Sequence, residues 1–519
     1  MAVSTLTSYL PPSLHEHSLS YLLILFFSYL IIGSIYRLYF HPLAKVPGPK
    51  LAALTLWYEF YHDFIRKGKY LWVIGDMHAK YGPIVRISPN EVHILDKDFY
   101  DTLYGHSLKL DKDPWAKDHP SGFGTGPSDL HRVRRSALNP FFSPHRINET
   151  QDIIVGKLTK LCDLLTQKRG SGVPVNLSNA YRAFTIDVIT EYVMTESIGY
   201  LDREDLGAPR YRMIRDGSAS QIVMNHFGWI MPIMKRLPYK WALWLFPDAE
   251  AALGLQRTNE QQILALKTAG PSHPSKTPAS TRTRNPMFHD VLFNSNLPAP
   301  EKTIERLGAE ATLVVIAGSD TVGNSLTKLH YHLLDNPDKL ARLKRELSDF
   351  GLGEGEERGK GVEGVKWQEL KELKYLSACV TEILRLGMTV THRLARVAGK
   401  EGVKYGGFLL PAGTSISMST YFTHLDPTLF PSPHDFIPER WLEPGSKTLN
   451  KYVNAFSKGP RICLGIELAY AELYLAAATI YSGFDTKLYQ TARDEVEVAH
   501  DFLNGYPRLD AKGVRVTVE

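Results

Sequence analysis

The sequence predicts a mainly α-helical protein with a small β component, preceded by one N-terminal transmembrane helix. Three observations predict this fold class: a charge-free apolar segment near the N-terminus, one short stretch of alternating apolar and polar residues, and apolar residues at helical spacing through most of the remaining chain. The chain has 519 residues, of which 44% are hydrophobic, so it can bury a large core. We therefore expect one large compact body after the membrane segment.

The apolar segment from Leu19 to Tyr36 is uncharged and long enough to cross a bilayer as a helix. A cleavable signal peptide is the alternative. No Lys or Arg precedes the segment, however, and it is longer than the roughly 7–15 residues of a signal peptide's apolar region. Positive charges follow at Arg37, Lys45 and Lys50, so the positive-inside rule places the body in the cytosol.

We divide the chain into four parts on this basis. Prolines between His41 and Lys50 favour a stiff connector over a continuing helix. The parts are a short luminal N-terminus (1–18), a transmembrane anchor (19–40), a proline-rich hinge (41–50) and the main domain (51–519).

Composition argues against several classes of protein. The formal net charge of +5 is small for this length, so nothing indicates nucleic-acid binding. Cys162, Cys379 and Cys463 have no paired spacing, which argues against a disulfide framework and indicates a reducing compartment. We expect Cys162 and Cys379 in the core.

The elements of the main domain follow in order. Residues 81–94 alternate around a turn signal and predict a small antiparallel sheet, whereas residues 301–334 carry a one-faced apolar stripe and predict a long buried helix. Residues 268–286 and 351–364 have the composition of solvated loops. Residues 411–460 are rich in turn residues and lead into a loop that contains a cysteine.

That loop, FSKGPRICLG, places Cys463 between glycines and directly before a predicted helix. Unpaired N–H groups at the start of the helix favour the thiolate, the form that binds haem iron. Gly459 and Gly465 let the backbone turn and approach a flat ring, and Arg461 is placed to pair with a haem propionate. The alternative is an inert buried cysteine, but this combination, which includes Phe456, is improbable by chance.

The loop is similar to the signature of the cytochrome P450 superfamily, and the chain resembles that family from the anchor to the C-terminus. The resemblance implies the α-rich cytochrome P450 fold, with residues 51–519 as a haem-thiolate monooxygenase domain. It implies haem b (iron protoporphyrin IX) as cofactor, with Cys463 as the axial ligand of the iron. It also implies NADPH–cytochrome P450 reductase as electron donor, with cytochrome b5 as an additional candidate, at the endoplasmic reticulum membrane.

Ala317-Gly318-Ser319-Asp320-Thr321 interrupts the stripe of the long helix, and Gly318 lowers helix propensity by roughly 1 kcal/mol relative to Ala. The resemblance implies an oxygen-activating groove, in which small residues make room for dioxygen while Thr321 and Asp320 relay protons. The alternative is a glycine kink with a threonine that bonds back to a carbonyl.

Glu382 and Arg385 lie three residues apart in an apolar helical stretch, where unpaired charges would be costly to bury. The segment from Phe436 to Trp441 resembles the family motif that brings a second arginine, here Arg440, to this pair. The resemblance implies that the three charges hold the cysteine-loop region against the helical core. The alternative is a solvent-exposed pair.

Other cations are candidates for the haem propionates. In the family, an aromatic residue and an arginine four positions apart bind a propionate from a helix like the one at residues 131–143. Here His131 stands where many relatives have Trp, and Arg135 follows it. Arg396 is a further candidate by its position after the Glu-x-x-Arg helix, although spacing does not decide between Arg393 and Arg396. A solvated basic face is the alternative for residues 131–143.

We expect an apolar substrate pocket built from distant segments. If the family's architecture holds, these are Lys109–Gly126, Ile222–Met234, the long helix, Met388–Thr391, and a rim at Phe502 and Leu503. The stretch at Ile222–Met234 could equally be core or a membrane-contacting face. The candidate pocket residues are Ala317, Ile316, Phe123, Val390 and Phe502.

Together these features predict a membrane-anchored monooxygenase that hydroxylates or epoxidises an apolar substrate with dioxygen and reductase-supplied electrons. Residues 41–49, 131–143 and 500–513 resemble the filamentous-fungal group that includes trichodiene oxygenase, whose members commonly oxidise secondary metabolites. A terpenoid is the first expectation, and a polyketide or peptide-derived scaffold the second. Two other classes are a haem-thiolate isomerase or dehydratase, which usually lacks the threonine, and a haem sensor or carrier, which leaves the proton-relay motif unexplained.

Overall fold

A computed structural model describes residues 18–113, 120–194, 197–230, 233, 236–245, 250–271, 286–353 and 362–519. The expected luminal N-terminus lies outside the described residues except for Ser18, and so does most of the two expected loops at 268–286 and 351–364. The described chain is rich in helices with several small sheets, which confirms the predicted fold class.

The helices span a wide range of lengths. The longer ones are α2 (Ser18–Ile35), α5 (Tyr70–Tyr81), α7 (Ser128–Ser136), α8 (Pro144–Lys168), α9 (Leu177–Val193), α10 (Ala208–His226), α13 (Glu250–Ala269), α15 (Ile304–Leu334), α16 (Pro337–Asp349), α18 (Lys374–Leu386) and α21 (Ile466–Gly483). The shorter α-helices are α3 (Lys50–Leu54), α4 (Trp57–Phe60), α6 (Tyr100–Tyr104), α12 (Tyr239–Leu245), α14 (Met287–Phe293), α17 (Trp367–Lys371), α19 (Thr420–His424) and α20 (Ser446–Asn450). Single 3-10 or π turns are η2 (Tyr36–Phe40), η3 (Tyr61–Ile65), η5 (Asn139–Phe142), η6 (Tyr200–Asp202), η8 (Ala299–Lys302), η9 (Pro438–Trp441), η10 (Gly459–Arg461) and η11 (Arg493–Glu495).

The largest sheet has the strand order β1-β2-β8-β5-β3. These strands are β1 (Ile84–Arg86), β2 (Glu91–Ile94), β3 (Asp111–Lys112), β5 (Arg396–Val397) and β8 (Ser415–Ser417). The β1–β2 hairpin is the antiparallel pair predicted at residues 81–94, with Ile84 opposite Ile94. The remaining strands are β4 (Val175–Asn176), β6 (Val403–Tyr405), β7 (Phe408–Leu410), β9 (Thr486–Leu488), β10 (His500–Phe502), β11 (Asn504–Tyr506) and β12 (Arg515–Val518).

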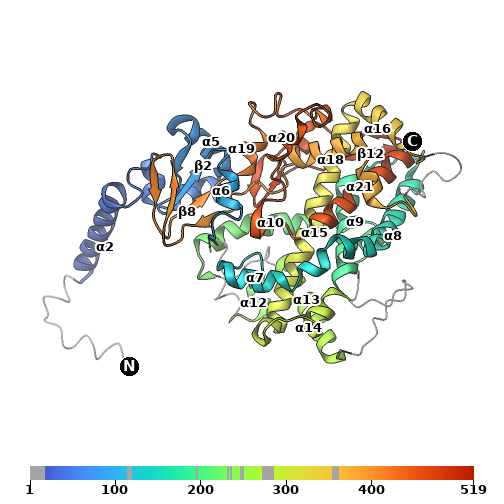
Figure 1. Cartoon of the computed structure of the whole chain (residues 1–519). Coiled ribbons are helices and arrows are strands. Elements are labelled where there is room, and N and C mark those ends of the chain that lie inside the picture. The colour runs from blue at the N-terminus through green and yellow to red at the C-terminus, as the bar shows by residue number, and fades with distance from the viewer. Residues whose placement is uncertain are drawn as a thin grey trace.

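The elements form two regions (Figure 1). The large sheet lies on the side from which α2 projects, with α5 and α6 beside it, while the helix-rich region contains α8, α9, α18 and α21 around the long central helix α15. The largest buried cluster lies in this helical region and includes the expected core residues Cys162 and Cys379. The long helix begins at an N-cap, Thr303, whose hydroxyl accepts from the Arg306 N–H at 3.2 Å.

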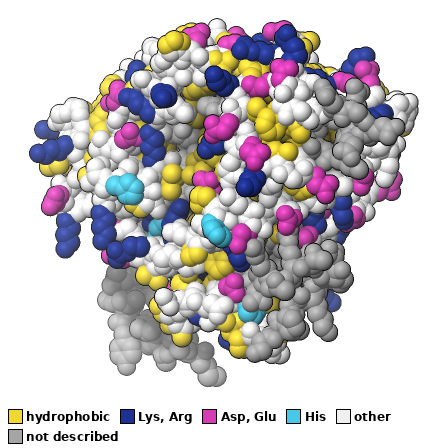
Figure 2. Space-filling model, turned by 45° about the vertical axis from the view of Figure 1, so that its right-hand side comes forward, with side chains coloured by type: hydrophobic (Ala, Val, Ile, Leu, Met, Phe, Trp, Pro, Cys, Tyr) yellow, Lys and Arg dark blue, Asp and Glu magenta, His cyan; other side chains and the backbone are white. Residues whose placement is uncertain are grey.

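The anchor helix is separate from this core. Residues Leu19–Phe40 form one apolar span with mean hydropathy 2.0, and none of its most apolar window is buried. This geometry is compatible with a single-pass membrane anchor. On the face drawn in Figure 2, basic and acidic side chains are interspersed, with hydrophobic side chains visible between them.

Candidate haem-thiolate site

The cysteine loop ends where α21 begins. The Cys463 N–H donates to the carbonyl of Phe456 at 2.8 Å and closes the loop. Gly459 has φ +67°, and a Cβ there would collide with the Tyr104 carbonyl, so only glycine fits. A Cβ at Gly465 would meet nothing within 4 Å, so protein packing does not explain that glycine.

The Cys463 side chain is exposed, although protein atoms surround it at longer range. Desolvation by this surrounding protein raises the pKa of the Cys463 thiol, whereas the Gly465 N–H and the Arg135 guanidinium lower it. By contrast, Cys162 and Cys379 are buried, and burial raises the pKa of both. Cys463 is therefore the one accessible thiol of the chain.

One face of α15 opens in the middle of the core. Ala317 is exposed, and Leu313 and Thr321, four residues to either side of it, are half-buried, although most of the helix is buried. Residues four apart lie on one helix face, so these three form a single open stripe. The Thr321 hydroxyl donates to the Ala317 carbonyl at 2.9 Å, which is the back-bonding geometry of the alternative interpretation.

Gly318 lies at the contact between α15 and α9. A Cβ there would lie 2.8 Å from Cγ1 of Ile189 in α9, so this glycine allows α9 and α15 to pack closely. Close packing of the two helices therefore accounts for a glycine at this position. Of the small residues in the motif, Ala317 is the one on the open stripe.

Asp320 is buried and its carboxylate is fully engaged. Oδ1 accepts from Nε of Arg182 at 2.8 Å, while Oδ2 accepts from Asn504 Nδ2 at 3.1 Å and from the Tyr506 hydroxyl at 3.3 Å. The two candidate proton-relay residues thus differ, because Thr321 lies on the open stripe while Asp320 points into an ion pair.

Four cations gather near the cysteine loop. Arg461 donates to the carbonyls of Thr125 at 2.8 Å and Gly126 at 2.7 Å, and Arg135 donates to the Ile462 carbonyl. Pairing of β3 with β5 sets Lys112 opposite Arg396. Among the described residues, no carboxylate lies within ion-pair distance of these four side chains.

Burial and mutual repulsion perturb this cluster. They lower the pKa of Arg461 to about 10 and that of His131 to about 3, with burial as the largest cause in each case. Burial, Arg396 and Arg461 lower the pKa of Lys112 well below its usual value. A concentration of largely buried basic side chains without an ion-paired carboxylate is suited to a dianionic ligand.

The structure separates Arg393 from Arg396. Arg393 is buried and pairs with Glu91 at 3.0 Å and with Glu59, away from the cations. Arg396 donates to the carbonyl of Leu394 at 2.9 Å and lies in the cluster. Only Arg396 is therefore placed to reach an anion bound there.

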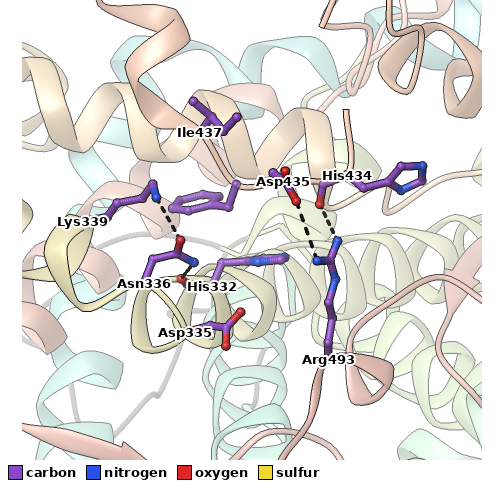
Figure 3. Close-up of a pocket in the computed structure, with 9 residues that line it drawn as sticks. His332, Asp335, Asn336, Lys339, His434, Asp435, Ile437 and Arg493 are labelled. Carbon is purple, nitrogen blue, oxygen red and sulfur yellow. Dashed lines mark hydrogen bonds and ion pairs between the residues drawn. The ribbon is translucent and has the colours of Figure 1, made fainter. Parts of the chain in front are cut away.

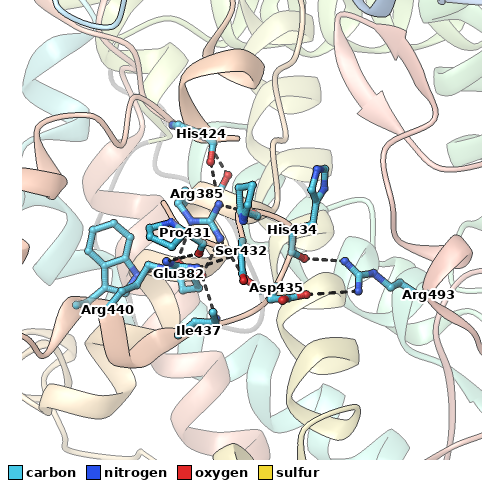
Figure 4. A network of polar contacts seen from close by, with 12 residues as sticks. Glu382, Arg385, His424, Pro431, Ser432, His434, Asp435, Ile437, Arg440 and Arg493 are labelled. Carbon is cyan, nitrogen blue, oxygen red and sulfur yellow. Dashed lines mark hydrogen bonds and ion pairs between the residues drawn. The ribbon is translucent and has the colours of Figure 1, made fainter. Parts of the chain in front are cut away.

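Glu382, Arg385 and Arg440 come together (Figure 4). Arg385 makes a bidentate pair with Glu382 at 2.7 and 2.9 Å, and both side chains are completely buried. Arg440 Nε and the Ile437 N–H donate to Oε1 of Glu382, and Trp441 donates to Oε2. Arg385 also binds the carbonyls of His424 and Pro433, which ties α18 to the segment leading to the cysteine loop.

The other candidate pocket residues are scattered. Ile316 packs against the core, and Phe123 is 40% exposed. Val390 pairs with Asn504 beside the β10–β11 hairpin. Phe502 differs from its expected position, because it is 4% exposed and stacks with His500, so at this rim Leu503 and not Phe502 is the exposed side chain.

Ile222–Met234 is described only in part. Within it, the Phe227 ring lies 5.7 Å from the rings of both Trp57 and Phe60. Trp57 is 59% exposed, so the described part of this stretch borders an aromatic surface near the end of the anchor.

A surface pocket of about 260 Å³ lies elsewhere (Figure 3). His332 and Asp335 line it at the C-terminal end of α15, and Lys339 lines it from α16. His434 and Arg493 line its other side (Figure 3). His332 is about three helical turns beyond Thr321. The pocket is polar and is separate from the cysteine loop.

Comparison with known proteins gives the family. The cytochrome P450 profile matches residues 49–506. The chain belongs to the cytochrome P450 family. It is 38% identical to a cytochrome P450 monooxygenase of Ascocoryne sarcoides, MO6277, over 93% of the chain and 95% of the relative. It is 38% identical to tryptophan 6-hydroxylase of Fusarium equiseti, with 94% of each covered. It is 35% identical to cytochrome P450 monooxygenase TRI4 of Fusarium sporotrichioides, over 92% of the chain and 91% of the relative.

Membership of the cytochrome P450 family makes the chain a monooxygenase with a haem-iron cofactor. The residues present fit this group, because an accessible thiol, an open helix stripe and a cluster of cations without carboxylates occur together. Lys112 is the member of the cluster that sequence reasoning missed. The only sign of it in the sequence was that Lys112 lies within the expected pocket segment Lys109–Gly126. The strands that bring it to Arg396, β3 and β5, are too short to show an alternating pattern of apolar and polar residues.

Proposed function

We propose that Cys463 ligates the iron of haem b and that Arg135, Arg396 and Arg461 bind its propionates, with His131 as a neutral hydrogen-bond donor. Lys112 joins this set. The accessible Cys463 thiol beside the cation cluster is the observation that carries the proposal. Phe456, Gly459 and Gly465 shape the loop around the thiol.

When bound, the haem iron supplies dioxygen activation and insertion of one oxygen atom into a C–H bond or a double bond. The chain's residues orient the substrate and move protons. Thr321 lies on the open stripe, so its hydroxyl can exchange its bond to the Ala317 carbonyl for one to a ligand. Asp320 supplies protons to Thr321, and for this its carboxylate first has to break its hydrogen bond with Asn504 or with Tyr506.

The same proposal covers the surroundings of the site. Ala317 and Ile316 form the distal wall, and Phe123 and Val390 lie at its edges. Of the two residues expected at the rim, Phe502 and Leu503, the exposed Leu503 closes it. The main domain (51–519) faces the cytosol from the endoplasmic reticulum, held by the anchor (19–40) and the hinge (41–50). Electrons come from NADPH–cytochrome P450 reductase, with cytochrome b5 as a second donor.

For the substrate we propose an apolar secondary metabolite, with a terpenoid first and a polyketide or peptide-derived scaffold as the alternative. Likeness to TRI4 supports the first. The second is favoured by two relatives named as hydroxylases of tryptophan and of N-acetyltryptophan, which are 38% and 35% identical to this chain.

Turnover of a substrate panel tests this function. The full-length protein, its reductase and NADPH are incubated with sesquiterpenes, aromatic polyketides, tryptophan and N-acetyltryptophan. We expect oxygen-dependent addition of one oxygen atom to one of these classes. Product formation without dioxygen or reductase would contradict the proposal, and oxidation of tryptophan alone would replace the terpenoid by the alternative.

A further inference from the structure

A short loop, residues 121–126, lies between the distal helix and the cysteine loop. The Gly122 N–H donates to Oε2 of Glu310 in α15 at 2.9 Å. On the opposite side, the carbonyls of Thr125 and Gly126 accept from Arg461 at 2.8 and 2.7 Å. Ser121, Gly122 and Thr125 are buried. The loop is therefore fastened on both sides of the candidate haem site.

Glu310 shares a helix face with the open stripe. It precedes Ala317 by seven residues and Thr321 by eleven, which correspond to about two and three full turns of α-helix. Phe123, at the tip of the loop, is 40% exposed, and the Lys112 ammonium lies 3.3 Å from its ring centroid. The contact between Glu310 and Gly122 thus joins an exposed aromatic loop to the helix face that carries Thr321.

A buried ion network holds Glu310 in place. Arg306 pairs with Glu310 at 2.6 Å and with Glu301 at 3.0 Å. Glu301 pairs in turn with Arg134 at 2.7 Å, and Arg134 donates to the Thr125 hydroxyl at 2.8 Å. The exposed fractions of the four charged side chains are 14% or less. Buried charges are stable only where each keeps its partner. The network runs from Glu310 on α15 back to Thr125 in the loop, so it holds the loop in one position relative to α15.

The two sides of the loop are not equivalent. Arg461 and Lys112 are proposed here to bind propionates, and a bound carboxylate competes with the carbonyls of Phe123, Thr125 and Gly126 for their N–H groups. With the cofactor present, the contacts on the side of α15 become the ones that position the loop.

We propose that Glu310 is a positioning residue that, through Gly122, sets the distance between loop 121–126 and α15 and so limits the size of ligand admitted beside Ala317. This proposal rests on the proposed haem site. It predicts that loosening the contact enlarges the space without altering the thiolate ligand.

Gly122→Ala perturbs the contact from the loop side. The new Cβ would lie 3.3 and 3.6 Å from the Glu310 carboxylate oxygens, which is close enough to shift the loop while the Arg306–Glu310 pair remains. Glu310→Gln perturbs it from the helix side, keeping an acceptor for the Gly122 N–H but removing the charge. Gly156→Ala is the matched control, because a Cβ there meets nothing within 4 Å.

The probes are imidazole and phenylimidazole, which report binding to haem iron as a shift of the Soret band in the haem-loaded full-length protein. We expect the ratio of the phenylimidazole Kd to the imidazole Kd to fall about fivefold in Gly122→Ala, the shift that the net contribution of one hydrogen bond produces. In Glu310→Gln, which keeps the acceptor and loses only the charge, the ratio should fall by a smaller factor. Gly156→Ala should match the wild type.

A ratio that rises, or that changes by less than about twofold in Gly122→Ala, overturns the role of Glu310. If imidazole produces no Soret shift in the wild-type protein, the haem site itself fails and the proposal with it. The two failures are distinguishable because the first leaves imidazole binding intact.

Discussion

Removing Arg385 should destabilise the protein far more than removing Arg440, although both contact the same carboxylate. Glu382 is completely buried and accepts five N–H groups, two of them from Arg385. Arg385 also satisfies the carbonyls of His424, Pro433 and Asp435. Arg440 contributes one donor to Glu382, and its side chain reaches the surface with 9% exposure.

These contacts set the magnitudes. Arg385→Ala leaves a buried carboxylate without its main partner, which costs about 3–5 kcal/mol. That is a large share of the roughly 5–15 kcal/mol that stabilises a typical domain. Arg440→Ala removes one charge-assisted hydrogen bond to Glu382, worth about 1.5–3 kcal/mol. It also removes two bonds to the carbonyls of Pro431 and Ser432, which are exposed and can bond to water instead. If these costs appear in the unfolding rate, inactivation accelerates by about two to four orders of magnitude in the first variant and about one to two in the second.

The assay is the rate at which the full-length protein loses its red-shifted carbon-monoxide band at a fixed temperature. A rate is the suitable measure because large cofactor-containing proteins commonly unfold irreversibly. Lys160→Ala serves as control, since its ion pair with Asp202 is exposed and should contribute at most about 1 kcal/mol. Equal inactivation rates for Arg385→Ala and Arg440→Ala would refute this reasoning.

Three further substitutions test the site and the core. Thr321→Ala should keep haem content near normal, because the hydroxyl bonds only within its own helix, while peroxide release rises and product falls; unchanged coupling of electrons to product would exclude a proton-transfer role. Ala317→Phe should block or redirect oxidation with an unchanged thiolate spectrum, since the new ring would occupy the open stripe; an unaltered product distribution would move the pocket elsewhere. Burial, and after it the negative charge of Glu59, raises the pKa of Asp63 from 3.8 to about 8. The contribution of Asp63 to the free energy of unfolding is therefore complete below pH 3.8 and is lost as the pH rises through about 8. Asp63→Asn keeps the acceptor for the Tyr70 N–H, bonded at 3.0 Å, and should inactivate more slowly than the wild type at alkaline pH; an identical pH dependence would show that Asp63 is ionised in the folded protein.

Local patterns were enough to predict the elements that carry their own signal. The long helix was expected at residues 301–334 and is found at Ile304–Leu334, because a one-faced stripe of that length has no other stable arrangement. The β1–β2 hairpin was predicted from apolar and polar residues that alternate around a turn signal. The cysteine loop was readable because its glycines and helix start lie within ten residues of one another.

Contacts between distant segments were not readable in the same way. The close contact of Gly318 with Ile189 was not predicted, since spacing fixes a helix face but not the neighbour that the face meets. The choice between Arg393 and Arg396 depended on Glu59 and Glu91, which lie about 300 residues earlier in the chain.

The central claim, that Cys463 is the haem ligand, is tested most directly by the carbon-monoxide spectrum of the reduced, full-length protein. Cys463→Ala should lose the red-shifted band. Cys162→Ser and Cys379→Ser are the controls. Both of those thiols are buried in the core, so each serine variant is compared only if it retains haem. We expect the band in the wild type and in the two serine variants. A red-shifted band that persists in Cys463→Ala would contradict the account.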